Sequence, residues 1–213
     1  MLPRSRAPEF PFGPAAHDSE ACGDYRPPMS GIHPIEGYAI VSADGMIADG
    51  DGNMPPSIRN QADQDFLQRE LDRAAVIVHG RHSHEGGPRA AARKRLILTR
   101  TVAATAADPT KPNALLWNPT GATLEAALAA LGVGAGVVAI IGGTEVFGLF
   151  LPHYDAFHLS CATRARIPGG RPVFPQVGPS AAVKDVLAEY GLRAVRRRDL
   201  DAAAGVSLTT WER

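Results

Sequence analysis

The most informative segment of the sequence is Val137-Val138-Ala139-Ile140-Ile141-Gly142-Gly143-Thr144-Glu145-Val146-Phe147-Gly148-Leu149-Phe150-Leu151-Pro152. Its five leading apolar residues, mostly β-branched, predict a buried central strand that stops at the glycine pair. After the pair, apolar residues recur at positions 146, 147, 150 and 151, which is the spacing of one helix face. We expect Thr144 to cap this helix and Pro152 to end it, so the unit is strand, Gly-Gly, helix.

That junction is suited to an anion, most naturally a phosphate. The first turn of a helix has backbone N–H groups without intrahelical acceptors, and glycines let a ligand approach the main chain. A glycine pair can equally serve only a tight turn, so a phosphate site and a purely structural turn both remain open. Glu145 suits the helix dipole but repels a phosphate unless its side chain points into solvent.

Composition narrows the class of protein. The chain has 213 residues, 45% of them hydrophobic, and its 22 basic and 22 acidic side chains give a formal net charge of zero. Zero net charge removes the long-range attraction that nucleic acid or an anionic membrane would need, so a small-molecule partner is expected. Cys22 and Cys161 are too few for a disulfide scaffold or a thiolate metal site. With no membrane span and no secretory signal in the sequence, we expect a soluble, cytoplasmic protein.

The sequence divides into two parts. Residues 1–34 are rich in Pro, Gly and small polar residues without periodicity, which predicts an extended or flexible N-terminal arm. Residues 35–213 have the length and the apolar content of a single domain. Within it, residues 49–55 form a loop rich in Asp and Gly, which we interpret as a mobile flap. The loop lacks the spaced ligands of a calcium loop, so calcium binding is not expected.

Strand and helix patterns alternate along the domain and then give way to a closing pair. Strands are expected at 38–41, with a short return through Met46 and Ile47, and at 75–79, 95–100, 137–141 and 154–160. Helices are expected at 61–75, 123–131, 144–151 and 183–190, and an antiparallel pair at 192–197 and 206–211. This order is typical of an α/β protein with a parallel sheet, where ligands bind at the carboxyl ends of the strands.

Two of these strand ends deliver an arginine. Arg81 follows Gly80, and Arg100 follows Thr99. The forked donors of a guanidinium are suited to a phosphate, and parallel strands would bring both to the same edge of the sheet. His79, His82 and His84 lie near the first of these ends, but no carboxylate or Cys spacing completes a metal site, so no metal is expected.

The helix at 61–75 carries the candidate acid. Asp63 shares a face with Leu67 and Leu71 and is therefore the inward carboxylate, whereas Asp65 can pair with Arg69 in solvent. A carboxyl on the apolar side of a helix loses hydration, so its pKa rises and it can relay a proton near neutral pH. Capping of the helix N-terminus by Asp63 is an equally ordinary interpretation of its position.

Three segments together carry a family resemblance. They are Val76-Ile77-Val78-His79-Gly80-Arg81-His82-Ser83, Leu96-Ile97-Leu98-Thr99-Arg100 and Ile140-Ile141-Gly142-Gly143-Thr144-Glu145-Val146-Phe147. With them the chain resembles, over residues 35–174, the dihydrofolate reductase superfamily, including the reductase domain of the riboflavin-pathway deaminase-reductases. The resemblance implies a three-layer α-β-α fold with a mixed central sheet and an antiparallel C-terminal hairpin. It also implies a cis peptide at the glycine pair, in contact with a cofactor pyrophosphate.

The same resemblance implies NADPH as cofactor and assigns roles to residues. Arg81 and Arg100, helped by Ser83 and Thr99, would hold the phosphate that distinguishes NADPH from NADH. Asp63 would assist protonation of the substrate and Ser160 would support it, with Asp65 as the alternative acid. The cofactor-binding set would be Ile40, Ile47, Gly80, Arg81, His82, Ser83, Thr99, Arg100, Ile141, Gly142, Gly143, Thr144, Glu145 and Val146.

The implied activity is hydride transfer to a pterin-like or ribosylaminopyrimidine heterocycle, of the dihydrofolate reductase or 5-amino-6-ribosylaminouracil reductase type. Pro56 stands where folate reducers have Trp, and Arg93 is the candidate counterpart of their tail-binding arginine. The turn Ser42-Ala43-Asp44-Gly45 instead resembles that of the riboflavin-pathway domain. A homodimer is also implied. The competing hypothesis is a nucleotide-binding module of the same fold without catalytic activity.

Overall fold

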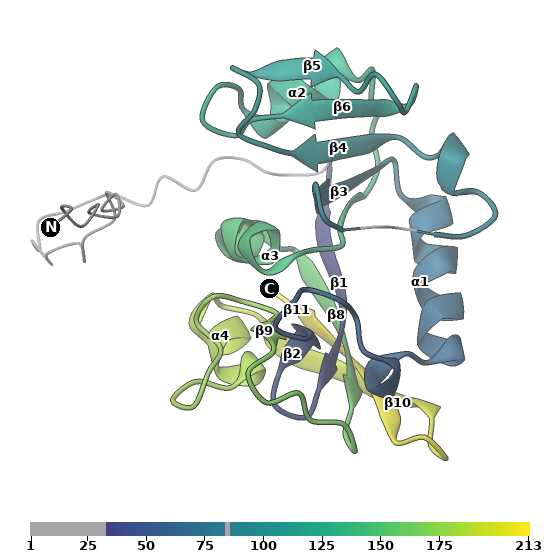
Figure 1. Ribbon diagram of the computed structural model, residues 1–213, viewed down its shortest axis with the longest axis vertical. Coiled ribbons are helices and arrows are strands. Elements are labelled where there is room, and N and C mark those ends of the chain that lie inside the picture. Colours follow the sequence, from purple (N-terminus) through teal and green to yellow (C-terminus); the bar gives the residue numbers. More distant parts are fainter. Residues whose placement is uncertain (1–32, 84–85) are drawn as a thin grey trace, which may run out of the picture.

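The computed structural model describes residues 33–83 and 86–213 (Figure 1). The N-terminal arm, apart from its last two residues, lies outside this part, as do Cys22 and His84. The division into an arm and a single domain therefore stays a prediction.

A sheet of nine strands forms the centre of the molecule. Its middle strand is β7 (Val138–Ile140), which lies parallel to β1 (Ile35–Ser42) on one side and to β3 (Val76–Gly80) on the other. Further parallel strands extend the sheet in both directions: β8 (Ala156–Ala162), β4 (Arg95–Leu98) and β6 (Ala114–Trp117). The central strand was thus correctly predicted from its apolar run, although it is shorter than expected.

Antiparallel strands close both edges of the sheet. At one edge β5 (Thr105–Ala107) pairs with β6. At the other, β11 (Val206–Glu212) pairs with β8 and with the outermost strand, β10 (Arg193–Asp201). The predicted C-terminal hairpin is confirmed, and the sheet is mixed.

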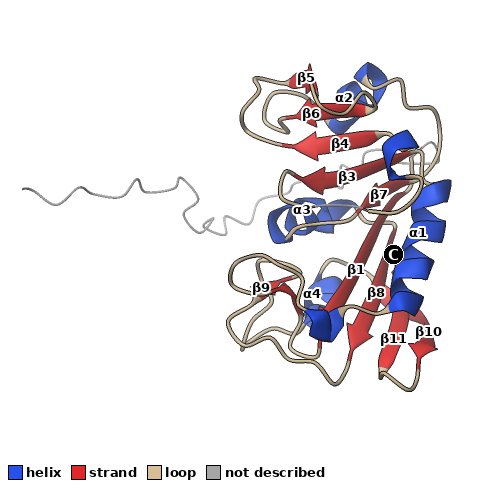
Figure 2. Ribbon diagram, turned by 45° about the vertical axis from the view of Figure 1, so that its right-hand side comes forward, coloured by secondary structure: helices blue, strands red, loops and turns tan. Residues whose placement is uncertain are grey.

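Helices cover both faces of the sheet, as Figure 2 shows. Residues of β3 alternate between the two sides: Val76 and Val78 belong to the largest of three core clusters, and Ile77 belongs to a smaller one on the opposite face. The larger core contains apolar residues of α2 (Leu124–Ala130), α3 (Thr144–Phe150) and α4 (Val183–Glu189). The smaller one contains those of α1 (Gln61–Arg73). The three-layer α-β-α architecture is therefore confirmed.

Three 3₁₀ turns and a two-stranded ribbon complete the described chain. The turns are η1 (Pro56–Ile58), η2 (Ala90–Ala92) and η3 (Leu151–His153). The ribbon joins β2 (Met46–Ala48) to β9 (Arg171–Pro172). The short return after the first strand was predicted, but its distant partner β9 was not.

One local prediction at the glycine pair was wrong. The N-cap of α3 is Gly143, which has no side chain to cap with, and Thr144 is the first helical residue. The Thr144 hydroxyl instead donates a hydrogen bond to the carbonyl of Pro172. This bond fastens the start of α3 to the ribbon between β2 and β9.

Candidate functional site

The glycine pair makes a sharp bend between β7 and α3. Gly142 has φ +112°, a left-handed conformation that side chains disfavour, and a Cβ there would lie 2.9 Å from the Phe147 ring. The Gly142–Gly143 peptide bond is cis, as the resemblance implied. The first intrahelical bond runs from Phe147 N–H to the Gly143 carbonyl, so the N–H groups before it have no acceptor within the helix.

The loop after β3 faces this bend. The Gly80 N–H donates to the Gly142 carbonyl at 2.8 Å, and a turn bond of 3.1 Å joins Ser83 N–H to the Gly80 carbonyl. A Cβ on Gly143 would lie 3.9 Å from the Ser83 hydroxyl oxygen, which places the two loops face to face. Glu145, at the start of α3, is exposed to solvent.

A cleft of about 1280 Å³ runs past both loops and along α1. Single-ligand pockets usually enclose about 300–1000 Å³, so this cleft has room for a cofactor together with a substrate. The predicted site residues that line it are Ile40, Ile47, Asp63, Gly80, Arg81, His82, Ser83, Ile141, Gly143, Thr144, Glu145, Val146 and Ser160.

Three members of the predicted set lie outside the lining. Gly142 is buried behind the bend. Thr99 is also buried, with its hydroxyl 2.9 Å from that of Thr101. Arg100 is exposed at the end of β4, next to β3 in the sheet, where Leu98 pairs with Gly80. Arg100 is thus on the expected edge of the sheet, but one strand away from the cleft.

Asp63 and Ser160, called here the predicted catalytic pair, line the same cleft. Ser160 lies on β8 beside Ile40 of β1, and Asp63 comes from the first turn of α1. Desolvation by the surrounding protein raises the pKa of Asp63, and hydrogen bonding by the Ser160 side chain partly offsets that rise. A carboxyl in this setting can hold a proton at a higher pH than a solvated one.

The structure does not support the two other interpretations of the acidic residues, namely Asp63 as the cap of α1 and Asp65 as the catalytic acid. Asn60 caps α1 by accepting from the Asp63 N–H at 3.2 Å, so Asp63 is not the cap. Asp65 is exposed and accepts a hydrogen bond from Gln61 at 2.7 Å rather than pairing with Arg69. Because Asp63 lines the cleft and Asp65 does not, Asp63 is the better candidate acid.

Residues 51–54 of the predicted flap also line the cleft. Arg171, next to the flap, donates hydrogen bonds to the Gly50 carbonyl at 3.2 and 3.3 Å. Sequence reasoning missed Arg171 because only the pairing of β9 with β2 brings it to the flap. Sequence reasoning also missed Tyr38, Phe66 and His158, which line the cleft. In the sequence these aromatic rings lie within strand and helix patterns that predict only core packing.

Arg93 has a structural role. It is 9% exposed, and its guanidinium donates to the Asp72 carboxylate at 2.6 and 3.1 Å. A further bond of 2.9 Å reaches the Gln68 side chain. These contacts tie the segment before β4 to α1, so the Arg93 guanidinium already has hydrogen-bond partners within the protein.

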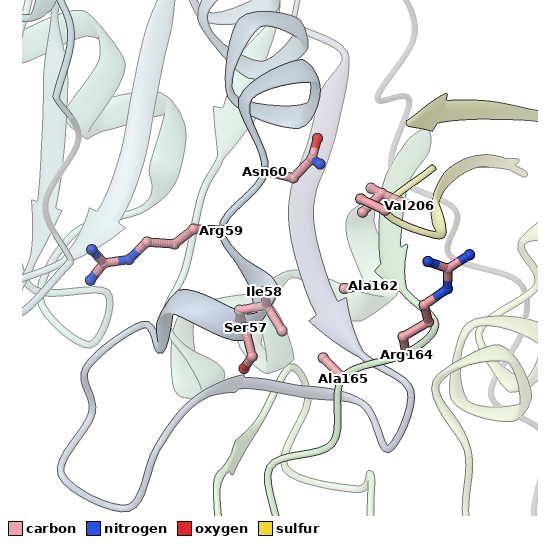
Figure 3. Close-up of a pocket in the computed structure, with 9 residues that line it drawn as sticks. Ser57, Ile58, Arg59, Asn60, Ala162, Arg164, Ala165 and Val206 are labelled. Atoms are coloured by element: carbon pink, nitrogen blue, oxygen red, sulfur yellow. The ribbon is translucent and has the colours of Figure 1, made fainter. Parts of the chain in front are cut away.

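A second, smaller hollow of about 150 Å³ lies between η1, the end of β8 and the hairpin of β10 and β11 (Figure 3). Arg59 extends away from it, and Arg164 donates to the Ala203 carbonyl at 2.6 Å. The side-chain amide of Asn60 donates a hydrogen bond to the Asp201 carboxylate at 2.9 Å. This hollow is far smaller than the large cleft and contains none of the predicted site residues, so the large cleft is the candidate site.

Two general features of the described chain concern metals and membranes. Across residues 33–83 and 86–213, no three His, Cys, Asp or Glu side chains gather in a way that could hold a metal ion. Nor is any helix in that part both long and apolar enough to cross a membrane.

Comparison with known proteins gives structural relatives only. No family model matches the chain, and no curated protein matches it significantly. Among solved structures, a diaminohydroxyphosphoribosylaminopyrimidine deaminase/5-amino-6-(5-phosphoribosylamino)uracil reductase from Thermotoga maritima matches at TM-score 0.59 and 16% identity, over 85% of this chain. The chain has the dihydrofolate-reductase-like fold.

Two further structures agree. A dihydrofolate reductase from Enterococcus faecalis, complexed with NADP(H) and RAB-propyl, matches at TM-score 0.58 and 18% identity, over 84% of this chain and 95% of its own. A protein from Shewanella sp. PV-4, described as a putative riboflavin biosynthesis protein, matches at TM-score 0.55 and 16% identity, over 84% of this chain and 98% of its own. The chain spans 56% of the Thermotoga protein. At these identities the likeness establishes the dihydrofolate-reductase-like fold alone.

Proposed function

We propose that this protein is an NADPH-dependent reductase that transfers hydride to a pterin-like or ribosylaminopyrimidine heterocycle. One observation carries the proposal: a single cleft joins the Gly80 loop and the bend at Gly143 to a desolvated carboxyl, Asp63. Phosphate-binding features and a proton donor in one cleft are what a nucleotide-dependent reductase needs.

The residues at the Gly80 end fit a dinucleotide. N–H groups in the first turn of α3 face a cleft that has no side chain on Gly143 to block it. Arg81, His82 and Ser83 add donors from the facing loop, with Arg81 and His82 exposed. Arg100 would contribute from the neighbouring strand if the adenosine end of the cofactor extends along the sheet edge.

The chemistry follows from these positions. NADPH, when bound, supplies the hydride. Ile40 and Ile47 form an apolar surface that orients the two reactants, and Asp63 delivers a proton to the reduced heterocycle directly or through water. Ser160 positions the Asp63 carboxyl, and the flap at residues 51–54 excludes bulk water from the reacting groups.

Within this substrate class, a ribosylaminopyrimidine is favoured over a folate. Arg93, the candidate counterpart of the arginine that binds a folate tail, is buried and bonded to Asp72 and Gln68, so it does not serve that role. The proposal also includes the homodimer and the cytoplasmic location expected from the sequence.

Cofactor binding and turnover test this proposal separately. We expect calorimetry to detect NADPH binding, and NADPH oxidation to appear with one of three substrates: dihydrofolate, dihydrobiopterin or the riboflavin-pathway aminopyrimidine. Binding without turnover on any of them would favour the non-catalytic nucleotide-binding module. Absence of NADPH binding would overturn the cofactor assignment itself.

A further inference from the structure

Two hydrogen bonds in series connect the far end of β10 to the first turn of α1. Asn60 is the N-cap of α1, and Asp201 is the last residue of β10, 141 residues further along the chain. The side-chain amide of Asn60 donates to the Asp201 carboxylate at 2.9 Å, and the Asn60 carbonyl oxygen accepts from the Asp63 N–H at 3.2 Å. We call these two bonds the tether. Figure 3 shows Asn60 at the start of α1, with its side chain directed toward the part of the hairpin that carries Val206.

The charge of Asp201 determines which way the Asn60 amide faces. Hydrogen bonds from the Ala204 N–H and from Asn60 lower the pKa of Asp201, so its carboxyl is ionised near neutral pH. An ionised carboxylate only accepts hydrogen bonds, so the NH₂ group of Asn60 must face it. The Asn60 carbonyl oxygen is then directed to the first turn of α1, whose N–H groups have no acceptor within the helix. Asp201 therefore orients the cap of α1.

The turn that carries Asp201 is itself fastened to the end of β8. The Arg164 guanidinium donates to the Ala203 carbonyl at 2.6 Å, and the Thr163 hydroxyl donates to the Gly205 carbonyl at 2.8 Å. Both donors directly follow the last residue of β8. The tether thus runs to the helix from a turn that is held against the sheet, and not from a free loop.

Asp63 is held from two sides as a result. Ser160 of β8 forms a side-chain hydrogen bond with it, while the tether holds its backbone N–H. Burial raises the pKa of Asp63, and the Ser160 bond partly offsets the rise. Among the described residues, no charged side chain adds to these two causes. The pKa of Asp63 therefore reports how deeply its carboxyl lies in the protein, and not the charge of its neighbours.

We propose that Asp201 is a positioning residue for the reaction: through Asn60 it holds the first turn of α1 so that the Asp63 carboxyl stays beside Ser160 in the cleft. The inference rests on the proposed function for the role of Asp63 as proton donor. It adds to that function a residue outside the cleft on which proton delivery depends. Asp201 itself does not line the cleft, so it acts only through Asn60, which does.

A purely structural tether would do no more than cap the helix. Serine is as good an N-cap as asparagine, because its hydroxyl oxygen also accepts from an N–H group of the first turn. The serine side chain is too short to reach Asp201, however, so Asn60→Ser keeps the cap and removes the anchor. Helix capping predicts that this substitution has no effect on Asp63, whereas positioning by Asp201 predicts that it displaces the Asp63 carboxyl.

Asp201→Ala removes the same bond from the other side. The turn should persist in this variant, because the bonds donated by Arg164 and Thr163 do not involve Asp201. Asp199→Ala is the matched control, since Asp199 is exposed on the same strand and the substitution removes an equal charge without touching the tether. Asn60→Ser changes no charge, so an effect shared by the two tether variants does not come from charge.

The first measurement is the pKa of the Asp63 carboxyl in the purified protein, from the pH dependence of its carboxyl carbon shift in NMR spectra. We expect this pKa to lie above 3.8 in the unaltered protein and in Asp199→Ala, and to fall toward 3.8 in Asn60→Ser and Asp201→Ala. Combining the two substitutions should add little, because both break one bond. An unchanged pKa in Asn60→Ser, which keeps the cap and should fold, overturns the proposal. An equal fall in Asp199→Ala does the same.

The second measurement is NADPH oxidation at saturating substrate. We expect kcat to fall about tenfold in Asn60→Ser and Asp201→Ala, because a displaced proton donor is less often in the productive geometry. The dissociation constant for NADPH should not change, since neither substitution touches the Gly80 loop or the bend at Gly143. A kcat equal to that of the unaltered protein in both tether variants overturns the positioning role.

The NMR titration needs no substrate or cofactor, so the inference and the proposed function can fail separately. If the Asp63 pKa falls in both tether variants and none of the three substrates is reduced, the reductase is refuted and the tether still positions Asp63. If NADPH is oxidised and the Asp63 pKa is unchanged in both variants, the reductase stands and the role of Asp201 is refuted.

Discussion

Asp63 is the residue on which the proposed chemistry depends most. Burial raises its pKa above the ordinary value of 3.8, so the folded state holds this proton more tightly than the unfolded chain does. The free energy of unfolding therefore falls as the pH rises from the pKa of Asp63 in the unfolded chain to its pKa in the folded protein. Replacement by Asn removes the ionisable group and that cost.

For Asp63→Asn we expect turnover to fall about 100-fold or more, because general acid catalysis contributes roughly 10²–10⁴-fold. The free energy of unfolding should exceed that of the unaltered protein at pH 7, and the difference should vanish below pH 3.8, where both side chains are neutral. Steady-state NADPH oxidation and urea unfolding across pH measure the two effects. Undiminished turnover would remove Asp63 from the mechanism.

Arg81 and Arg100 were predicted to act together, but only Arg81 lines the cleft. For Arg81→Ala we expect NADPH to bind about 10- to 100-fold more weakly, with NADH binding nearly unchanged, because one charge-assisted contact to the extra phosphate is lost. Arg100→Ala should have a smaller effect. Calorimetric titration with both nucleotides measures this selectivity.

Arg69→Ala is the control for both, since Arg69 is exposed on α1 and does not line the cleft. Equal NADPH selectivity in all three variants would contradict the assignment of the phosphate site to these two strand ends.

At the scale of single elements, the bend between β7 and α3 serves both folding and ligand binding. We expect Gly142 to be needed for folding and the adjacent Gly143 to be needed for binding. In Gly142→Ala the new Cβ would meet the Phe147 ring at 2.9 Å in a left-handed backbone. We expect a loss of about 2 kcal/mol or more in the free energy of unfolding, measured by urea denaturation.

Gly143→Ala is the matched substitution one residue on. Gly143 has φ −79°, and its nearest contact for a Cβ is 3.9 Å away, so the fold should tolerate the methyl group. That methyl group would project toward the cleft and the Ser83 loop. We therefore expect nearly unchanged stability and at least tenfold weaker NADPH binding by calorimetry. The opposite pattern, stable Gly142→Ala with unstable Gly143→Ala, would contradict this division of roles.

Among the strands, the central ones were predicted correctly from a continuous apolar signal. The runs that became β3, β4 and β7 are buried on both sides of the sheet, so nearly every residue in them is apolar. β5 and β6 were not predicted, because short segments among polar loops carry no period that distinguishes a strand from a loop. The partner of β2 was also missed, since pairing over more than 120 residues leaves no local trace.

The candidate site could be predicted only in part for the same reason. Gly80, Arg81 and the glycine pair follow strand ends, a position that sequence reveals directly. His158 and Tyr38 resemble core residues, and only the register of β1 against β8 brings them beside Ser160. The one-residue error at Thr144 arose because a helix start without a side-chain cap has no sequence signature.

At the scale of the whole molecule, the charge of one sheet edge bears on assembly. β10 is the outermost strand and carries Arg193, Arg196, Arg197 and Arg198, all exposed. Two such edges paired with each other would bring like charges together, an arrangement by which natural edge strands avoid association. If the protein is a homodimer, as the resemblance implies, its interface should lie elsewhere.

From the resemblance we expect sedimentation equilibrium at micromolar concentration to give a dimer. Because the interface should lie away from β10, we expect Val195→Lys to leave that dimer intact. Val195 is 54% exposed on β10, so the substitution adds another charge to that edge without disturbing the core. Dissociation caused by Val195→Lys would place the interface on β10, because a lysine there would then be buried against four arginines. A monomer in the unaltered protein would refute the dimer.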